Sequence, residues 1–373
     1  MNANESELTR IAAEEINVKM ETTEKMENIE KKSVQNLCGK NVQSWINGPC
    51  RIIQTQVKLP CAMRFFSEEQ IRQLLKPDEV IRAIRDAFAR DFHQTLRMPV
   101  RTQLEIAGGV LLLMPCYDSG LQAAGVKMVT VSPEAGVIAT YALLDAGSGE
   151  MLAMMEANWL TDLRTAATSA VATDLLARSD AQTLGIFGAG RQAIAHLTVL
   201  PRIRNFRRFL VCGSDRSDMK KFASTIKEEQ GIEIEVVSAE ACTRESDVIC
   251  TCTTASEPVF DGSWLRAGTH LNLVGAFQPH TREVDDQTVR RAGVVVDTYE
   301  GALAEAGDLL IPLRSGVIGK NHIIADLHEI ASGKKTGRTG RDDITLFKSV
   351  GCALEDLVTA RLAFSSQRSA FSP

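Results

Sequence analysis

The sequence TLGIFGAGRQAIAHL, residues 183–197, decides the fold. Its apolar run at 184–187 predicts a buried strand, and glycines at 188 and 190 follow directly. The apolar residues after the glycines recur at helical spacing: Ile194, Leu197 and Leu200. A strand, a glycine turn and a helix in this order form the unit that binds a dinucleotide in doubly wound α/β proteins.

Each small residue of the glycine turn has a physical role in such a unit. Gly188 permits the tight turn, Gly190 lets the backbone approach a pyrophosphate, and Ala193 lets the helix pack on the strand. The pyrophosphate accepts hydrogen bonds from the free N–H groups at the positive end of the helix. The turn and the first residues of the helix are Gly188, Ala189, Gly190, Arg191 and Gln192. The alternative is a tight turn that binds no ligand.

Length and charge set the broad class of the protein. The 373 residues allow two domains that each bury a core. A net charge of −5, from 42 basic and 47 acidic residues, argues against a general nucleic-acid binder. No apolar run approaches the roughly 18 residues of a membrane span, so no membrane partner is expected.

The nine cysteines and six histidines are scattered. The cysteine spacing predicts reduced thiols in a cytoplasmic protein, and the isolated histidines predict no metal site. Residues 1–62 mix Glu and Lys and contain few large apolar residues. We expect them to form a mobile extension, or to lie upstream of a true start at Met63.

Residues 63–178 predict helices and a separate sheet. Helical spacing of apolar residues appears at 77–92. Five segments predict strands in series, which is typical of an antiparallel sheet: 101–106, 110–114, 124–131, 137–145 and 150–156. A long helix is expected at 159–177, and its many small side chains permit close approach of another element or of a ligand.

After the glycine turn, strands alternate with helices, which predicts a parallel, doubly wound sheet. Its further strands are expected at 209–212, 232–237, 248–253, 270–274 and 294–297. Helices are expected at 215–230 and 325–331, and an apolar segment at 344–363 runs into a final helix.

The end of the second strand of this sheet bears on the choice between NAD and NADP. NAD-specific sheets place an acidic residue there, about 20 residues after the glycines, on the ribose 2′-hydroxyl. Gly213 occupies that place, and Ser214 and Arg216 suit a 2′-phosphate because arginine presents a fork of donors to phosphate. The sequence therefore favours NADP, while Asp215 leaves NAD possible if the strand ends later.

Several motifs resemble the ornithine cyclodeaminase/mu-crystallin family, in the same order and from Met63 to the end of the chain. They are MPVR at 98–101, GVLLLMP at 109–115, GVK at 125–127, LRTAATSA at 163–170, FGAGRQ at 187–192, VGAFQP at 274–279, REVD at 282–285, EAGD at 305–308, TLFKSVG at 345–351 and ED at 355–356. Residues 1–62 lie outside the resemblance.

The resemblance implies a homodimer with two domains per subunit. Residues 63–178 and 342–373 would form a discontinuous α+β domain that binds substrate and dimerises. Residues 179–341 would form a Rossmann domain inserted into it, which binds NAD(P). The chemistry shared by the family is hydride transfer between the nicotinamide and the α carbon of a small amino or imino acid.

Arg101, Lys127 and Arg164 occupy the positions at which the family binds the substrate carboxylate. A carboxylate buried beside a cofactor needs positively charged donors to offset its desolvation. Each cation also has a purely structural interpretation. Arg101 could be a solvated strand residue, Lys127 a charge on an edge strand and Arg164 a cation on a helix surface. Lys127 stands in an apolar strand, where a charge requires a partner.

The resemblance also implies the contacts to the cofactor. The residues concerned are Gly188, Ala189, Gly190, Arg191 and Gln192 at the pyrophosphate, Ser214, Asp215 and Arg216 near the adenosine ribose, Thr253 and Thr254 on the adenine side, Val274 and Gly275 near the nicotinamide ribose, and Ser349 at the nicotinamide. The alternative for Thr253 and Ser349 is structural capping.

Two departures from the cyclodeaminase pattern bear on the reaction. Leu112 and Phe277 stand where ornithine cyclodeaminases carry a glutamate and an aspartate. A cyclodeaminase needs carboxylates to move protons and to hold a distal ammonium, whereas reduction of a preformed imine needs fewer groups. The sequence therefore favours an NAD(P)H-dependent reductase of a small imino acid such as pyrroline- or piperideine-2-carboxylate, or the reverse amino-acid dehydrogenase.

Two other functions stay open, namely an ornithine or lysine cyclodeaminase and a non-catalytic NADP-binding protein. The proton donor is also open. The candidates are Lys127, Glu105 and His280, in that order, and a water molecule is the alternative.

Overall fold

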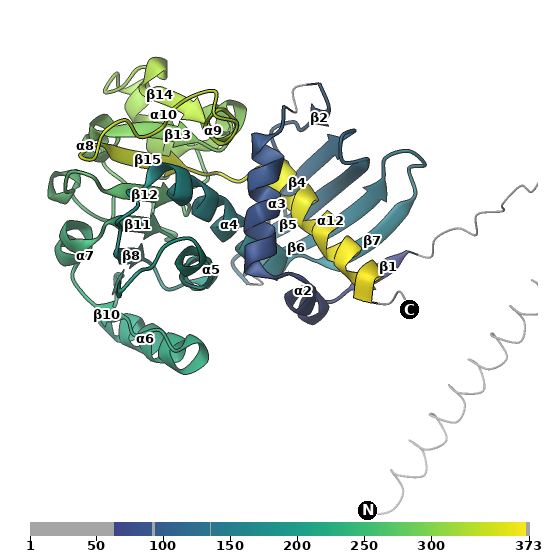
Figure 1. Ribbon diagram of the computed structural model, residues 1–373, viewed down its shortest axis with the longest axis horizontal. Helices are drawn as coiled ribbons and strands as arrows, with labels where there is room; N and C mark the ends of the chain where they lie inside the picture. The colour runs from purple at the N-terminus through teal and green to yellow at the C-terminus, as the bar shows by residue number, and fades with distance from the viewer. Residues whose placement is uncertain (1–62, 92–93, 135, 371–373) are drawn as a thin grey trace, which may run out of the picture. The chain divides into compact units, whose positions relative to one another are not determined.

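The structure, a computed structural model, describes residues 63–91, 94–134 and 136–370. The mobile extension expected for residues 1–62 lies outside these described residues. The described part of the chain contains two β-sheets with helices packed against them (Figure 1).

The first sheet is built from consecutive segments of the chain. Its strands are β1 (Arg64–Phe66), β2 (Leu96–Arg97), β3 (Thr102–Ile106), β4 (Gly109–Asp118), β5 (Ala123–Ser132), β6 (Gly136–Asp145) and β7 (Met151–Glu156). They lie in the order β1-β7-β6-β5-β4-β2, and β3 also pairs with β4. Every pair except β1–β7 is antiparallel, as expected from the five strand-like segments.

One face of the first sheet is buried beneath helices. Helix α3 (Pro77–Ala89) and helix α12 (Ala353–Ala370), from the end of the chain, cross this face side by side (Figure 1). Side chains alternate along a strand, so Leu112, Met114 and Val129 face these helices. Lys127 lies on the same inner face, paired directly with Met114 on β4 and Tyr141 on β6.

Helix α4 (Asn158–Leu176) is buried on all sides. Every residue from Asp162 to Thr173 is buried, as in a helix enclosed by other elements. Its small side chains allow this packing against α3, α12 and α5 (Arg191–Val199) and against strands of both sheets. Asn272 Nδ2 also donates to Thr173 Oγ1 at 2.8 Å. The helix therefore joins the two sheets, and Arg164 lies in its buried stretch.

The second sheet is parallel throughout. Its strands are β8 (Thr183–Phe187), β9 (Arg208–Cys212), β10 (Glu235–Val236), β11 (Val248–Thr251), β12 (His270–Leu273), β13 (Ala292–Val296), β14 (Ile323–Asp326) and β15 (Ile344–Lys348). The order is β10-β9-β8-β11-β12-β15-β13-β14. The chain turns to opposite sides of β8, which is the arrangement of a doubly wound dinucleotide-binding sheet. The expected fold class is confirmed.

Helices occupy most of the connections of the second sheet. They are α5, α6 (Arg216–Gln230), α7 (Ala239–Glu245), α8 (Asp286–Arg291), α9 (Tyr299–Glu305), α10 (Gly307–Arg314) and α11 (Leu327–Ala331). The short helix α2 (Glu68–Leu74) packs on the first sheet, where it contacts β7.

Strands β14 and β15 differ from the sequence-based expectation. A helix was expected at 325–331, but residues 325 and 326 end strand β14 and the helix begins at Leu327. The segment from residue 342 was assigned to the first domain, but β15 lies between β12 and β13 of the second sheet. Short apolar runs buried on both faces carry no periodicity that separates strand from helix. We retain the division into two domains as a proposal, with the return to the first sheet placed after Lys348.

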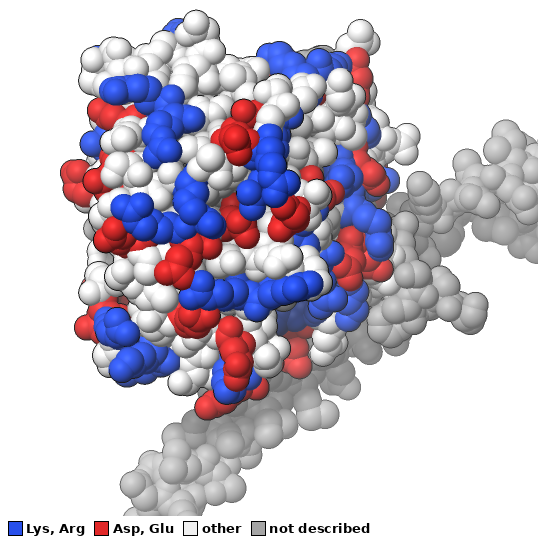
Figure 2. All heavy atoms as spheres, turned by 60° about the vertical axis from the view of Figure 1, so that its left-hand side comes forward, with Lys and Arg blue, Asp and Glu red and all other residues white. Residues whose placement is uncertain are grey.

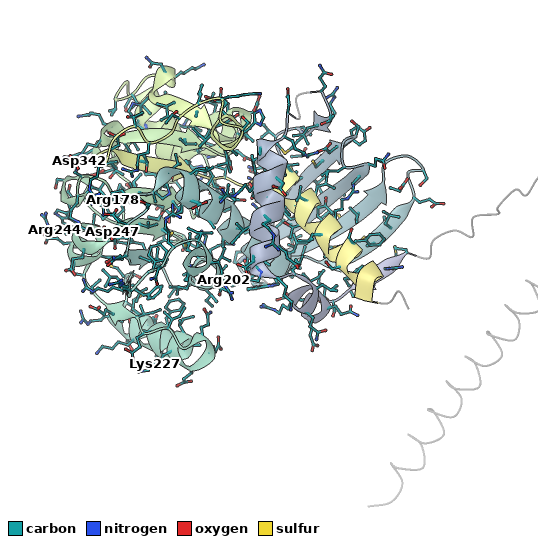
Figure 3. All side chains as sticks on the ribbon, in the orientation of Figure 1. Arg178, Arg202, Lys227, Arg244, Asp247 and Asp342 are labelled. Atoms are coloured by element: carbon teal, nitrogen blue, oxygen red, sulfur yellow. The ribbon has the colours of Figure 1, made fainter. Side chains whose placement is uncertain are left out.

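Asp247 fixes the entry of the chain into strand β8. Its Oδ1 accepts a hydrogen bond from Arg178 Nη2 at 2.8 Å. Its Oδ2 accepts from the N–H groups of Gln182 and Thr183 at 2.9 and 3.0 Å. Arg178 and Asp247 are labelled close together in Figure 3, and Asp247 directly precedes strand β11 of the second sheet. This half-buried carboxylate therefore places the strand that leads into the glycine turn.

Charged side chains of both signs are interspersed over the face drawn in Figure 2. Many charged side chains of the described residues are paired, and Arg208, for example, contacts Glu235 at 2.7 Å and Glu245 at 2.5 Å. Within residues 63–91, 94–134 and 136–370, no helix combines the length and the apolar character that a membrane crossing requires.

Candidate active site

The glycine turn has the geometry of a pyrophosphate-binding loop. Gly188 has φ +105°, and a Cβ at this position would stand 2.6 Å from the carbonyl oxygen of Cys252. Gly190 is the N-cap of α5, where no side chain caps the helix and a Cβ would point into open space. Ala193 is fully buried. The first N–H groups of α5 are therefore accessible to an anion, as the dinucleotide interpretation requires.

The side chains of Arg191 and Gln192 are engaged elsewhere. Arg191 donates from Nε and Nη2 to Asp162 Oδ2 at 2.8 and 2.7 Å, and Gln192 Nε2 donates to Asp162 Oδ1 at 3.1 Å. Asp162 is a buried residue of α4 that the sequence analysis did not identify. These two side chains fix α5 on α4, and the backbone N–H groups remain the donors for a pyrophosphate.

The loop after β9 carries the residues assigned to the adenosine ribose. Asp215 caps helix α6, because its Oδ1 accepts from the N–H groups of Ser217 and Asp218 at 2.6 and 2.9 Å. These backbone hydrogen bonds hold the pKa of Asp215 below its usual value. Ser214 and Arg216 are exposed beside it. Asp215 is the residue that could bind the ribose of NAD, and one of its carboxylate oxygens is thus occupied in capping α6. Ser214 and Arg216 are accessible.

A buried glutamate holds the loops after β11 and β12 together. Glu283 accepts hydrogen bonds from Thr251 Oγ1, from Thr253 N and Oγ1, and from the N–H groups of Gly275 and Ala276, over 2.7–3.2 Å. A Cβ on Gly275 would stand 2.1 Å from the carbonyl oxygen of Thr253. The hydroxyl of Thr253 is therefore used in structural hydrogen bonding, one of the two roles open from the sequence.

The remaining cofactor candidates lie at the same ends of the strands. Thr254 is exposed after β11, and Val274 is half-buried after β12. Ser349 follows β15 and is buried, and its Oγ donates to Asp297 Oδ2 at 3.2 Å. Asp297 also accepts from the N–H groups of Val350 and Gly351, both at 2.7 Å. Burial, and then the charge of Glu355, raise the pKa of Asp297 to about 6.

Lys127 and Arg164 meet at the start of helix α12. Lys127 Nζ donates to Asp356 Oδ1 at 2.8 Å, and Arg164 Nε lies 2.9 Å from the same oxygen. Arg164 Nη1 also donates to Glu355 Oε2 at 2.5 Å. Lys127 is 1% exposed and Arg164 5%, so neither is a surface charge. Burial, and then the Arg164 charge, lower the pKa of Lys127 to about 8, although Asp356 opposes the shift.

Arg101 reaches the same region from the loop before β3. Its Nε donates to Glu305 Oε2 at 2.9 Å, and its Nη2 donates to the carbonyl oxygens of Val350 and Gly351. Gly351 is also packed against Arg164, since a Cβ there would stand 2.7 Å from Arg164 Nη1. Arg101 and Arg164 therefore contact one turn, residues 350–352, and Lys127 joins Arg164 at a shared oxygen of Asp356.

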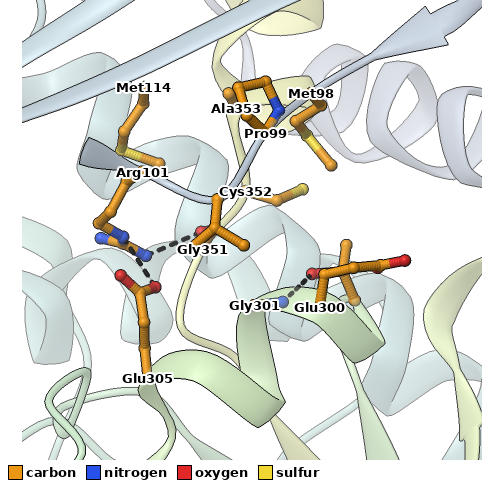
Figure 4. A pocket seen from close by; sticks show the side chains of 12 residues that line it. Met98, Pro99, Arg101, Met114, Glu300, Gly301, Glu305, Gly351, Cys352 and Ala353 are labelled. Atoms are coloured by element: carbon orange, nitrogen blue, oxygen red, sulfur yellow. Dashed lines mark hydrogen bonds and ion pairs between the residues drawn. The ribbon is translucent and has the colours of Figure 1, made fainter.

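A pocket lies in front of this turn (Figure 4). Its lining comprises Met98, Pro99, Val100, Arg101, Met114, Thr298, Glu300, Gly301, Glu305, Gly351, Cys352 and Ala353. Arg101 lines the pocket and points toward Glu305 and Gly351 in Figure 4, whereas Lys127 and Arg164 lie outside this lining. The pocket combines apolar and sulfur-containing side chains with a few charged groups, as is typical of a small-molecule site.

The other two proton-donor candidates are exposed, unlike the buried Lys127. Glu105 is exposed on β3, and His280 is exposed in the loop after β12. Of the two departures, Leu112 is buried on the same sheet face as Lys127, and the ring of Phe277 lies 5.9 Å from the Arg101 guanidinium carbon. Apolar groups therefore stand beside the cations at both positions.

Three carboxylates that pair with the cations were not assigned a role from the sequence. They are Glu305, Glu355 and Asp356. A pair of acids at the start of a helix ordinarily indicates interaction with the helix dipole, so no local pattern signals a cation partner. Among the described residues no cluster of His, Cys, Asp and Glu could hold a metal ion.

Comparison with known proteins identifies a family and several relatives to which this chain is similar. A sequence model of the ornithine cyclodeaminase/mu-crystallin family matches residues 62–370. A Delta(1)-pyrroline-2-carboxylate reductase of Bacillus cereus is 36% identical over 312 residues, covering 81% of this chain and 96% of the relative. Ketimine reductase mu-crystallin of Mus musculus is 36% identical over 321 residues, covering 82% and 97%. The Thermococcus litoralis Delta(1)-pyrroline-2-carboxylate reductase, in complex with NADH and L-proline, has a TM-score of 0.80 and 41% identity, covering 83% and 98%.

We expect a methyl group to have different effects at the two glycines of the turn, on stability at Gly188 and on dinucleotide binding at Gly190. Gly188→Ala should lower the free energy of unfolding by roughly 1–3 kcal/mol, because it combines a strained φ with a clash against Cys252. Gly190→Ala should leave stability nearly unchanged and weaken dinucleotide binding at least about tenfold, since its Cβ enters the space assigned to the pyrophosphate. Urea denaturation and quenching of protein fluorescence by NADPH measure the two effects. Equal dinucleotide affinity in wild type and Gly190→Ala would contradict the assignment.

Proposed function

The chain belongs to the ornithine cyclodeaminase/mu-crystallin family, and we propose that it reduces a small imino acid to an L-amino acid with NAD(P)H, or catalyses the reverse dehydrogenation. The observation that carries this proposal is that Arg101 and Arg164 contact one turn, residues 350–352, beside the ends of the strands of a dinucleotide-binding sheet, while Lys127 shares an oxygen of Asp356 with Arg164. Two relatives are named for imine reduction, and the Thermococcus enzyme was solved with NADH and L-proline.

In the proposed reaction the bound nicotinamide supplies a hydride to the α carbon of the imine. The guanidinium groups of Arg101 and Arg164 bind the carboxylate of the substrate and orient the carbon–nitrogen bond. The ammonium of Lys127 is the first candidate to donate a proton to the imine nitrogen, because it is buried beside Arg164, whereas Glu105 and His280 are exposed.

The apolar side chains near the cations favour imine reduction over cyclodeamination. Leu112 and Phe277 offer no carboxylate to hold a distal ammonium or to shuttle protons. Reduction of an imine that is already formed requires neither function. A cyclic substrate without a distal charge, such as pyrroline- or piperideine-2-carboxylate, fits a pocket lined in part by Met98, Met114 and Cys352.

We propose NADP as the preferred cofactor. Ser214, Asp215 and Arg216 are all exposed, but Asp215 Oδ1 already accepts two backbone hydrogen bonds as the cap of α6. An arginine beside the ribose supplies donors for a 2′-phosphate. The Thermococcus relative was solved with NADH, so use of NAD is the alternative that the experiment decides.

We also propose a homodimer built on the outer face of the first sheet. Across β3, β4, β5 and β6, one outward row runs through Leu104, Leu111, Thr130 and Ile138, and the next through Thr102, Leu113, Met128 and Thr140. Leu104 and Ile138 are about half exposed, at 54% and 48%. An apolar sheet face of this kind marks an interaction surface, and a second copy covers it with a self-complementary contact.

The cytoplasmic location stays a prediction from the cysteine spacing.

If the proposed reaction is correct, the protein oxidises NADPH in the presence of pyrroline- or piperideine-2-carboxylate. The loss of the absorbance of the reduced nicotinamide measures this reaction. Arg164→Lys should lower kcat/KM on the order of 100-fold, because one ammonium cannot replace the paired donors of a buried guanidinium. Unchanged turnover in this variant would contradict the carboxylate assignment. Ammonia release from ornithine or lysine without net NADPH consumption would identify a cyclodeaminase, and cofactor binding without turnover would identify a binding protein.

The cofactor proposal predicts a lower KM for NADPH than for NADH. Arg216→Ala should raise the KM for NADPH about 10- to 100-fold and leave that for NADH unchanged, because it removes one charge-assisted contact. Lys220→Ala, an exposed cation on the same helix, serves as the matched control. A lower wild-type KM for NADH, unaffected by Arg216→Ala, would show that NAD is the cofactor.

The dimer proposal predicts a mass of two chains by size-exclusion chromatography with light scattering. Leu113→Asp places a charge in the middle of the apolar face and should give the mass of one chain. Glu228→Lys, on the exposed side of α6, should leave the dimer intact. Wild-type protein with the mass of one chain at micromolar concentration would refute the proposal.

A further inference from the structure

Asp356 contacts two of the proposed substrate-binding cations through a single oxygen. Its Oδ1 lies 2.8 Å from Lys127 Nζ and 2.9 Å from Arg164 Nε. Lys127 comes from strand β5 of the first sheet and Arg164 from helix α4, so this oxygen sets the separation of two groups that the chain brings from different elements. The Asp356 side chain is fully buried, which makes the contact dry.

The neighbouring acid on the same helix turn has a different environment. Glu355 Oε2 accepts from Arg164, and its Oε1 accepts from the N–H of Cys352 at 3.1 Å, which caps the start of α12. Asp356 has no such structural hydrogen bond within the described residues. Its Oδ2 lacks any hydrogen-bond partner in this part of the chain, although it is buried. Buried carboxylate oxygens are normally satisfied, so the unpaired Oδ2 leaves the contacts with the two cations as the polar side-chain contacts of Asp356 among the described residues.

The groups that face Lys127 come from every element packed around it. They are Arg164 on α4, Asp356 on α12, Arg101 before β3, Tyr141 on β6 and Cys116 on β4. Tyr141 and Cys116 are neutral near pH 7, because burial raises the pKa of both groups. Among the described residues, Asp356 is the anion that contacts the Lys127 ammonium.

We propose that Asp356 is a positioning residue, which holds Lys127 and Arg164 at the spacing of a substrate carboxylate and keeps Lys127 in its ammonium form. The inference rests on the proposed function, in which these cations bind the imino acid. Asp356 does not itself contact substrate in this role. It acts through the two cations, and it balances their charge when no substrate is bound.

The sign of the pH effect follows from the charges. Burial and Arg164 lower the pKa of Lys127, and Asp356 raises it. Activity that needs the ammonium is lost as pH rises through the pKa of Lys127. Removal of the Asp356 charge therefore moves this alkaline limb to lower pH, by about one pH unit or more for an ion pair at this distance.

The test is the pH profile of kcat/KM for imine reduction in four variants. Asp356→Asn should move the alkaline limb down by about one unit or more and raise the KM for the imino acid. Asp356→Glu keeps the charge but displaces the shared oxygen, so it should raise KM without moving the limb. Glu355→Gln and Tyr141→Phe, matched changes at the adjacent acid and at the adjacent buried hydroxyl, should leave the limb in place. NADPH binding and circular dichroism check that each variant folds.

Two results would overturn the inference alone, provided that the wild type reduces the imine. One is an alkaline limb in Asp356→Asn that coincides with that of the wild type. The other, decisive even if Asp356→Asn fails to fold, is an Asp356→Glu variant with wild-type KM. A wild type that reduces no imine in the panel would instead refute the proposed function, and the inference with it.

Discussion

The contact on which the site depends is the buried cluster of Lys127, Arg164, Glu355 and Asp356. Burial of isolated charges is strongly unfavourable, and mutual pairing offsets that cost only when the geometry is good. The four residues come from the first sheet, from α4 and from α12, so their pairing joins segments as many as 229 residues apart. The pairing ties α12, which follows β15 of the second sheet, to strand β5 of the first sheet.

Buried carboxylates have a similar role on the cofactor side. Glu283 holds the loops after β11 and β12 together by accepting hydrogen bonds from their N–H groups. Asp297 holds the turn after β15 in the same way. That turn then presents the carbonyl oxygens of Val350 and Gly351 to Arg101. The turn is thus held by Asp297 from the second sheet and by Arg101 and Arg164 from the other side. A shift of either set of contacts would change the distance between the proposed hydride carrier and the proposed carboxylate site.

The arrangement also separates two kinds of buried acid. Glu283 and Asp297 accept mainly backbone N–H groups, and they determine the shape of loops. Asp356 pairs with cations, and it therefore determines charge and spacing. The apolar neighbours Leu112 and Phe277 add no competing carboxylate near these cations. The site is consequently suited to bind one carboxylate and to transfer few protons, as imine reduction requires.

The sequence by itself predicted the dinucleotide-binding unit and most strands of the two sheets, because these depend on local patterns. The three cations were identified from the resemblance to the family. The glycine turn needs small residues at fixed places, and Lys127 stands in an apolar strand where a charge must find a partner. The tertiary structure alone decided what those partners are. Glu283 and Asp356 stand in motifs of the resembled family and Asp297 does not, but the sequence assigned no partner to any of the three acids. Strand β15 is a short apolar run whose periodicity does not separate strand from helix. Their roles arise from contacts between distant segments, which no local pattern records.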